Sequence, residues 1–421
     1  MKKLISVLLA VAMVLTFAAC ATTKEAPPAN QPAAPAAQEP AAPANEPAAT
    51  EEDFHIGIVT GSVSQSEDDR RGAEAIQDMY GKDRVVLGIY PDNFPEELET
   101  TIQTIVNLSD DPLMKAIIVN QAVPGTAEAF RIVKERRPDI LCLAGESHED
   151  LPVIGASADV VVNNDFVARG YLMIWTAHEL GCDTFVHISF ARHLSYETMS
   201  RRVAIMQEAC KEFGMTFAFE TAPDPTTEIG MAGAQAFMLE KVPEWIEKYG
   251  KNAAYFCTND GETEPLLKQL LAYGGYFIEA DLPSPLMGYP SALGIDLTAE
   301  AGDFAKILAK VEAAVVEQGG AGRFGTWAYS YGYVTTAGLA QHAINVINGE
   351  CELTDIDALS KAYQVFSPAA AWNGSNYTNV ETGVKSDNVF LIYQDTYMMG
   401  NPGRYMGTPN VEVPEKYFTI S

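Results

Sequence analysis

Polar and aromatic side chains gather at the points where predicted strands of this chain end. The carboxyl ends of parallel strands share one edge of a sheet, so the loops that follow them are where α/β proteins hold ligands. Here those loops mix amides, hydroxyls, carboxylates and aromatic rings, which suits a polar ring such as a sugar or a nucleoside. The candidate ligand contacts are Thr60, Ser62, Ser64, Gln65, Tyr90, Asn120, Gln121, Glu146, Ser147, Arg192, Asn259, Asp260, Asp296, Trp327 and Tyr329.

Catalytic and cofactor chemistry find little support in the sequence. His193 and Ser195 are close enough to suggest a nucleophile and its base, but no GxSxG elbow or glycine-rich oxyanion loop accompanies them. The charged run 148–150 has no neighbours that complete a metal-ligand set. The sequence also contains no P-loop and no GxGxxG motif. We therefore predict a binding protein, not an enzyme, with no cofactor and no catalytic or metal site.

Strands alternate with helices from residue 54 onward, and the alternation occurs in two successive sets. The first set predicts strands at 55–61, 84–90, 115–120 and 139–145, with helices at 68–80, 96–108 and 126–137. The second predicts helices at 164–180, 195–213, 231–249 and 264–272, with strands at 184–190, 215–220, 253–259 and near 276. Such alternation indicates parallel sheets covered on both faces, and two sets in series indicate two similar lobes. A further helix is predicted at 333–347, and residues 368–421 are expected to form an irregular extension.

The first twenty residues have the pattern of a lipoprotein signal peptide. Lys2 and Lys3 precede the apolar run 4–17, and Ala18-Ala19 stand directly before Cys20. We expect cleavage before Cys20 and lipidation of its thiol; an ordinary secretory signal with a chance cysteine is the alternative. Residues 21–52 are rich in Ala, Pro and Glu, which predicts a disordered tether. The protein is thus expected on the extracytoplasmic face of the cell membrane, held by lipid.

Composition narrows the range of partners. The chain of 421 residues has a formal net charge of −28, which disfavours nucleic acid and anionic lipid surfaces as partners. The same charge weakly favours a neutral or cationic ligand. Beyond Cys20, the cysteines Cys142, Cys182, Cys210, Cys257 and Cys351 are widely spaced and odd in number. We expect buried single thiols in preference to a disulfide framework.

Several segments resemble the type I periplasmic substrate-binding proteins, in particular the ribose- and nucleoside-binding lipoproteins. HIGIVTG with DDRRGAEAI resembles the first strand, ligand loop and helix of that family, and VVNNDFVARGYLMIWTAHELG resembles the segment that opens its second lobe. Asn259-Asp260 and the GID that ends at Asp296 match ligand-contacting strand ends, and Arg201 and Arg202 fall where the family places a ligand-facing arginine. The resemblance covers about residues 54–366. More narrowly, the chain is similar to uncharacterised clostridial lipoproteins of this superfamily.

The resemblance implies an α/β fold of two doubly wound lobes joined by about three hinge crossings, near residues 150–165, 296–326 and 350–366. The expected lobes are 53–163 with 326–350, and 164–325 with 351–366, followed by an extension at 367–421. It also implies a monomer that captures a small polar ligand between the lobes and delivers it to an ABC transporter permease. A cytoplasmic repressor of related fold is disfavoured by the signal peptide and by the lack of a helix-turn-helix segment.

Other interpretations of these residues remain open. The first loop has SVSQSEDD where sugar binders carry an aromatic pair, so ring stacking is expected instead from Trp327, Tyr329 and Tyr331. Trp327 equally suits a core position. Arg201 and Arg202 also fit a solvated helix face, and Asn259-Asp260 also fit a helix cap. A ligand-sensing lipoprotein that serves a signalling receptor, and less so a surface hydrolase, are the alternative functions.

Overall fold

The computed structural model describes residues 53–63 and 66–420. All of them belong to one compact unit, residues 51–421. The predicted signal peptide, the lipidation site Cys20 and the tether lie outside the described residues, as do the candidate contacts Ser64 and Gln65. Within the described part of the chain, no helix combines the length and the apolar character needed to cross a membrane.

The first lobe is built on a seven-stranded sheet in the order β10-β11-β5-β4-β3-β1-β2. All neighbouring strands are parallel except β10, which runs antiparallel to β11. The central strands β3, β4 and β5 are mostly buried runs of branched aliphatic residues, as expected for parallel strands covered on both faces. The strands are β1 (His55–Thr60), β2 (Val85–Ile89), β3 (Met114–Asn120), β4 (Leu141–Gly145), β5 (Val160–Asn164), β10 (Trp372–Thr378) and β11 (Lys385–Gln394).

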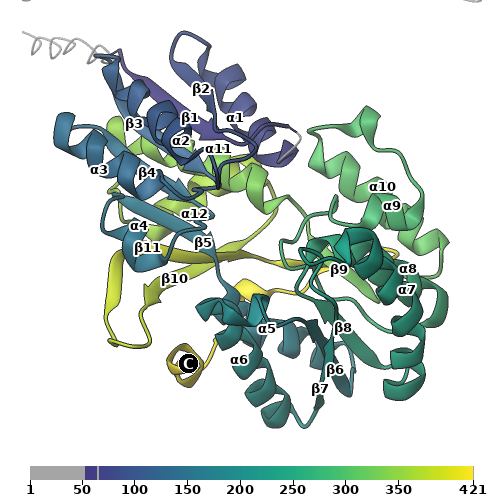
Figure 1. Ribbon diagram of the computed structural model, residues 1–421. Helices are drawn as coiled ribbons and strands as arrows, with labels where there is room; N and C mark the ends of the chain where they lie inside the picture. Colours follow the sequence, from purple (N-terminus) through teal and green to yellow (C-terminus); the bar gives the residue numbers. More distant parts are fainter. Residues whose placement is uncertain (1–52, 64–65, 421) are drawn as a thin grey trace, which may run out of the picture. The chain divides into compact units, whose positions relative to one another are not determined.

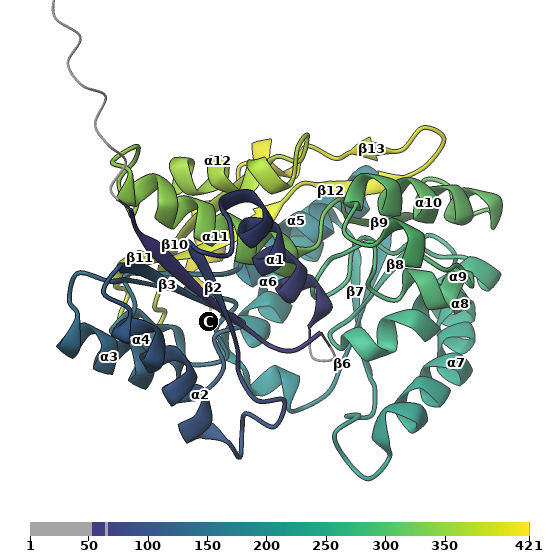
Figure 2. The same cartoon turned by 90° about the horizontal axis from the view of Figure 1, so that it is seen from above.

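Helices cover both faces of this sheet. Figure 2 shows α1, α11 and α12 on one side of the strands and α2, α3 and α4 on the other. Helix α11 is buried along most of its length because it packs against α1, α12 and the strands β3 and β4. The helical segments are α1 (Glu67–Tyr80), α2 (Leu98–Val106), the 3₁₀ turn η1 (Asn107–Asp110), α3 (Thr126–Arg136), α4 (Leu151–Gly155), α11 (Tyr331–Ile347) and α12 (Ile356–Phe366).

The second lobe contains two three-stranded sheets, β7-β6-β8 and β13-β12-β9. Residues 276–277 join them, since Tyr276 bridges to Ala254 in β8 and Phe277 bridges to Phe324 in β9. The strands β6, β7 and β8 are parallel to one another, whereas β12 is antiparallel to both of its neighbours. The strands are β6 (Thr184–Ser189), β7 (Thr216–Thr221), β8 (Ala253–Cys257), β9 (Phe324–Trp327), β12 (Thr396–Met399) and β13 (Arg404–Tyr405).

The helices of the second lobe follow its strands in sequence, and Figure 1 shows them around β6, β8 and β9. They are α5 (Phe166–Glu179), η2 (His193–Ser195), α6 (Glu197–Phe213), α7 (Gly230–Tyr249), η3 (Asp260–Glu262), α8 (Thr263–Tyr273), α9 (Tyr289–Leu293), η4 (Thr298–Glu300) and α10 (Phe304–Glu317). Two short turns, η5 (Thr408–Asn410) and η6 (Glu415–Thr419), end the described chain. The predicted α/β class with two parallel-sheet lobes is confirmed.

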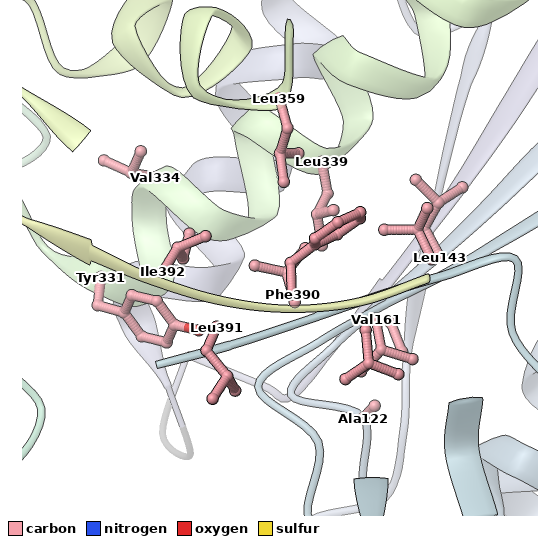
Figure 3. Close-up of a cluster of buried hydrophobic side chains, with 14 of the residues drawn as sticks. Ala122, Leu143, Val161, Tyr331, Val334, Leu339, Leu359, Phe390, Leu391 and Ile392 are labelled. Atoms are coloured by element: carbon pink, nitrogen blue, oxygen red, sulfur yellow. The ribbon is translucent and has the colours of Figure 1, made fainter. Parts of the chain in front are cut away.

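The C-terminal segment differs from the irregular extension expected from the sequence. Strand β11 adds to the first lobe beside β5, and its apolar residues enter the main core. Figure 3 shows Phe390 on the side of Leu339 and Leu359, which belong to α11 and α12, and Leu391 on the opposite side of the strand. This alternation is the two-residue period of a strand buried on both faces. Residues 372–399 are therefore part of both lobes and not an appendage.

Two of the three crossings between the lobes lie at other residues than the sequence predicts. The chain passes between the lobes at 165, within the expected range 150–165, and again at 328–330 and at 395. Residues 296–326 instead contain α10 and β9, and residues 351–366 contain α12, which packs on α11 of the first lobe. The expected assignment of 351–366 to the second lobe is therefore corrected. The third crossing comes from the C-terminal segment, because β11 and β12 are nearly continuous but pair in different sheets.

Candidate functional site

The carboxyl ends of the parallel strands place polar residues from both lobes in one site. In the first lobe these ends carry Thr60, Tyr90, Asn120, Gln121 and Glu146, in the second Thr258 and Asp260. Five carboxylates are electrostatically linked across the lobes, because the pKa of Glu146 is raised by burial and by the charges of Asp69, Asp260, Asp281 and Asp68. We call these residues, Asp68, Asp69, Glu146, Asp260 and Asp281, the acidic cluster.

Asn120 organises the part of the site that belongs to the first lobe. Its Nδ2 donates to Asp69 Oδ1 at 3.2 Å and to Thr336 Oγ1 at 2.8 Å, which connects β3 with α1 and α11. Gly145 is required beside it, because a Cβ at that position would collide with Asn120 Oδ1. Asp69 is 1% exposed, and burial raises its pKa to about 7. The first turn of α1 is thus held against the ends of β3 and β4.

Glu146 has an unusual backbone conformation for a residue with a side chain. Its φ of 48° lies in the left-handed region, which costs a non-glycine residue conformational energy. The backbone N–H donates to Val162 O at 2.9 Å and fixes the turn that follows β4. The side chain is half-buried among like charges, which is why its pKa lies well above the ordinary value. Strain and charge repulsion at the same residue indicate a functional position.

The second lobe adds a mixed acidic and basic group. Arg202 Nη2 donates to Asp281 Oδ1 at 2.5 Å, and the guanidinium lies over the rings of Phe166 and Phe256. Burial, and to a lesser degree the charge of Asp281, raise the pKa of Asp260 to about 8. The positive charge of Arg202 acts in the opposite direction and lowers the pKa of Asp260, although Arg202 and Asp260 form no ion pair among the described residues.

His193 belongs to a hydrogen-bond chain and not to a catalytic pair. Its Nδ1 lies 3.0 Å from Thr258 Oγ1, and Thr258 Oγ1 lies 2.8 Å from Ser189 Oγ. Ser195 Oγ instead donates to Arg192 O at 2.6 Å. Burial lowers the pKa of His193, so the ring is neutral at neutral pH. The nucleophile–base arrangement considered from the sequence is therefore not formed by these residues.

A buried ion pair lies beside the site and joins four elements. Arg169 Nε donates to Glu279 Oε1 at 2.7 Å, and its Nη1 donates to Asn164 Oδ1 at 2.8 Å at the end of β5. Glu279 Oε2 accepts from Trp327 Nε1 at 3.0 Å and from Thr396 Oγ1 at 3.1 Å. These contacts connect α5 with β5, β9 and β12 next to the crossings. They therefore hold these four elements together next to the site.

The remaining sequence-predicted contacts have other partners. Ser62 donates to Asp92 Oδ1 and Arg192 pairs with Asp224, each within its own lobe. Ser147 Oγ donates to Glu149 O, and Asn259 Oδ1 accepts from Gly261 N, which is the capping role considered above. Thr60 Oγ1 donates to Gly61 O. These hydrogen bonds shape the loops at the strand ends within each lobe.

Four candidates are corrected by the structure. Arg201 donates to the carbonyls of Ile420 and Phe418, so it holds the C-terminal tail. Asp296 is exposed and accepts from Thr298. Trp327 is fully buried and bonded to Glu279, and the Tyr329 hydroxyl donates to Pro368 O. Trp327 is therefore not free to stack on a ligand, and Tyr329 is held at the loop around residue 368 through its hydroxyl.

Sequence reasoning missed several residues of the site. Asp68, Asp69 and Asp281 were not among the candidates, and neither was the pair formed by Arg169 and Glu279. For Asp68 and Asp69 the available signal was an acidic pair in the first turn of the helix that follows β1. Asp281 had no local signal, because it follows a two-residue bridge and not a regular strand.

Four of the five cysteines beyond Cys20 are the buried single thiols expected from the sequence. Cys142, Cys182, Cys210 and Cys257 are buried free thiols, and Cys351 is a partly exposed free thiol. No group of three or more His, Cys, Asp or Glu residues in the described part of the chain is arranged to hold a metal ion.

Several buried carboxyls have raised pKa values, so the free energy of unfolding is expected to depend on pH. Burial raises the pKa of Glu262 to about 8, and both its carboxyl oxygens are buried without a hydrogen bond among the described residues. The pKa of Asp260 is likewise raised to about 8, and that of Asp69 to about 7. Because the folded state keeps protons that unfolded carboxyls lose near about pH 4, the free energy of unfolding is expected to fall as the pH rises from about 5 to about 8.

Urea unfolding at the two ends of that pH range measures how steeply the free energy of unfolding falls with pH. Glu262→Gln is expected to flatten it, whereas Asp296→Asn, at an exposed acid, leaves it unchanged. A stability that rises over the same range would contradict the assignment of protonated buried carboxyls.

The fold and the site define a two-lobed α/β protein in which the strand ends of both lobes contribute to one polar site. A structure described as "Putative transcriptional regulator" from Clostridium difficile 630 has the same fold, with a TM-score of 0.75 and 22% identity over 83% of this chain and 100% of that chain. A solute-binding protein from Actinobacillus succinogenes 130z with bound D-allose is similar at a TM-score of 0.44 and 14% identity, over 71% of this chain and 93% of that one.

The chain belongs to the family described as "Protein of unknown function (DUF3798)", whose model matches residues 54–325. A second family model matches residues 336–420, which include the C-terminal strands. Two uncharacterized proteins of Treponema pallidum (strain Nichols) are related. One is 42% identical to this chain over 50% of this chain and 94% of its own length. The other is 39% identical over 41% of this chain and 81% of its own length. The narrower likeness to clostridial lipoproteins stays a prediction.

Proposed function

We propose that this protein is a lipid-anchored, extracytoplasmic solute-binding protein that captures a small polar ligand for an ABC importer. The acidic cluster is the observation that carries the proposal. There burial raises the pKa of Glu146 in the first lobe, and so do the charges of Asp260 and Asp281 in the second. A ligand bound at these strand ends contacts both lobes, so binding favours their closed arrangement. A permease can recognise that change of shape. A sugar or a nucleoside is the ligand class that the sequence favours.

Binding without turnover is the property to be tested. Residues 51–421, which form one compact unit, are screened by thermal shift and calorimetry against sugars, nucleosides, amino acids and amines. We expect saturable binding of at least one class, with the compound recovered unchanged. Silence across all four classes, or conversion of the compound to a product, would overturn the proposal.

Membrane attachment is tested separately through Cys20. Cys20→Ser removes the thiol that would carry the lipid. We expect the wild-type protein in the membrane fraction of producing cells and the variant in the soluble extracytoplasmic fraction, as measured by fractionation and immunoblotting. Cys351→Ser, which changes a partly exposed thiol of the folded body, is the matched control and is expected to stay with the membrane. Equal membrane association of the Cys20 and Cys351 variants would contradict lipidation at Cys20.

A further inference from the structure

We propose that the ligand carries a protonated amine, which is held by Asp69 and Glu146 of the first lobe and by Asp260 of the second. This inference rests on the proposed function and specifies its ligand. It differs from the neutral sugar or nucleoside that the loop composition favours.

The first argument is the balance of charge at the site. Among the described residues, the positive charges beside the acidic cluster are already paired, Arg202 with Asp281 and Arg169 with Glu279. No ion pair in the described part of the chain involves Asp68, Asp69, Glu146 or Asp260. These four acids therefore have no partner cation in that part of the chain, and their ionised forms repel one another. A cationic group bound among them would relieve both their mutual repulsion and the cost of their burial.

The second argument is independent of charge and concerns hydrogen-bond acceptors. Asn120 is fully buried, and its Oδ1, which faces Gly145 just before Glu146, makes no hydrogen bond among the described residues. Asp69 Oδ2 is also buried without a hydrogen bond of good geometry, although the Ser66 hydroxyl is close enough to lower the pKa of Asp69 against the effect of burial. Buried acceptors of this kind need a donor. An ammonium group supplies three N–H donors and the opposite charge.

The geometry favours an organic cation over a metal ion. The carboxylates come from the first turn of α1, the turn after β4 and the turn after β8. They are close enough to shift one another's pKa, yet no three of the described His, Cys, Asp or Glu residues converge as metal ligands. A calcium ion requires six to eight oxygens at about 2.3–2.6 Å. An ammonium group donates to at most three oxygens at about 2.8 Å, which can lie in separate directions.

Matched pairs of compounds test the inference on residues 51–421. The probes are glucosamine against glucose, and putrescine against 1,4-butanediol, measured by calorimetry at neutral pH. We expect at least one amine to bind about tenfold or more tightly than its neutral counterpart, the factor expected for a charge-assisted hydrogen bond. Equal binding of amine and neutral members would overturn the inference, whereas the proposed function would stand.

Variants locate the amine on the cluster. Glu146→Gln and Asp260→Asn each keep the shape of the side chain and remove its ability to carry a negative charge, and each is expected to weaken amine binding about tenfold or more. Asp296→Asn is the control, because Asp296 is an exposed acid outside the site. Thermal unfolding without ligand shows that each variant is folded. If both cluster variants bind the amine as the wild type does, the inference is wrong. Failure of every probe, neutral ones included, would also overturn the inference, and the screen of all four compound classes would then decide the proposed function.

Discussion

Arg169→Ala is expected to lower the free energy of unfolding by about 3–5 kcal/mol. Arg169 is 1% exposed, and besides its pair with Glu279 it donates to the carbonyls of Asp281 and Ala280. Its removal leaves the Glu279 carboxylate buried with only the two neutral donors of Trp327 and Thr396. The cost arises from that uncompensated charge more than from the lost attraction.

Urea unfolding followed by far-ultraviolet circular dichroism measures this loss. Glu279→Gln in the Arg169→Ala background is expected to recover part of it, since the buried charge is then gone. Arg131→Ala, which removes an exposed arginine of α3 with two exposed partners, is the control and is expected to change little. A loss under about 1 kcal/mol for Arg169→Ala would show that water reaches Glu279 and that the pair does not join the two lobes.

Phe390→Ala is expected to cost a similar amount, about 3–5 kcal/mol. Phe390 is 2% exposed and lies on β11, where it packs toward Leu339 and Leu359 (Figure 3). Truncation removes buried apolar surface and leaves a cavity between the strand and α11 and α12. The same chemical denaturation measures the loss.

Val384→Ala provides the comparison within the same segment. Val384 is 63% exposed just before β11, so its truncation is expected to change the stability by less than about 0.5 kcal/mol. If Phe390→Ala were equally mild, the C-terminal strands would not belong to the core of the first lobe. A large difference between the two substitutions would confirm that the core depends on residues beyond 367.

The regular part of the fold could be predicted because its signals are local. Strands such as β3 and β6 are apolar runs bounded by turn residues, and helices such as α6 have apolar residues at helical spacing. Strand β11 had the same signal, in the run VFLIY at 389–393, but its position after the predicted lobes suggested an extension. Its place beside β5 depends on a pairing between residues far apart in the chain, which a local pattern cannot specify.

The site was predictable in part for the same reason. Asn120 ends β3, Glu146 directly follows β4 and Asp260 lies shortly after β8, so the parallel arrangement places them at the edge of the sheets where α/β proteins bind ligands. Arg201 and Arg202 show the limit, since the two are adjacent and chemically identical. In the folded protein Arg202 pairs with Asp281 in the site. Arg201 instead donates to carbonyls of the C-terminal tail, which lie more than two hundred positions further along the chain.

By itself, then, the sequence determined the α/β class, the two sets of strands and helices, and the strand-end positions at which a ligand can bind. These features follow from periodicity and turn chemistry within short stretches. Only the tertiary structure decided that the C-terminal strands complete the first lobe, that Trp327 is core, and that acids from both lobes share one site. Each of these depends on contacts between residues distant in sequence, where burial and the balance of charge are set by the whole fold.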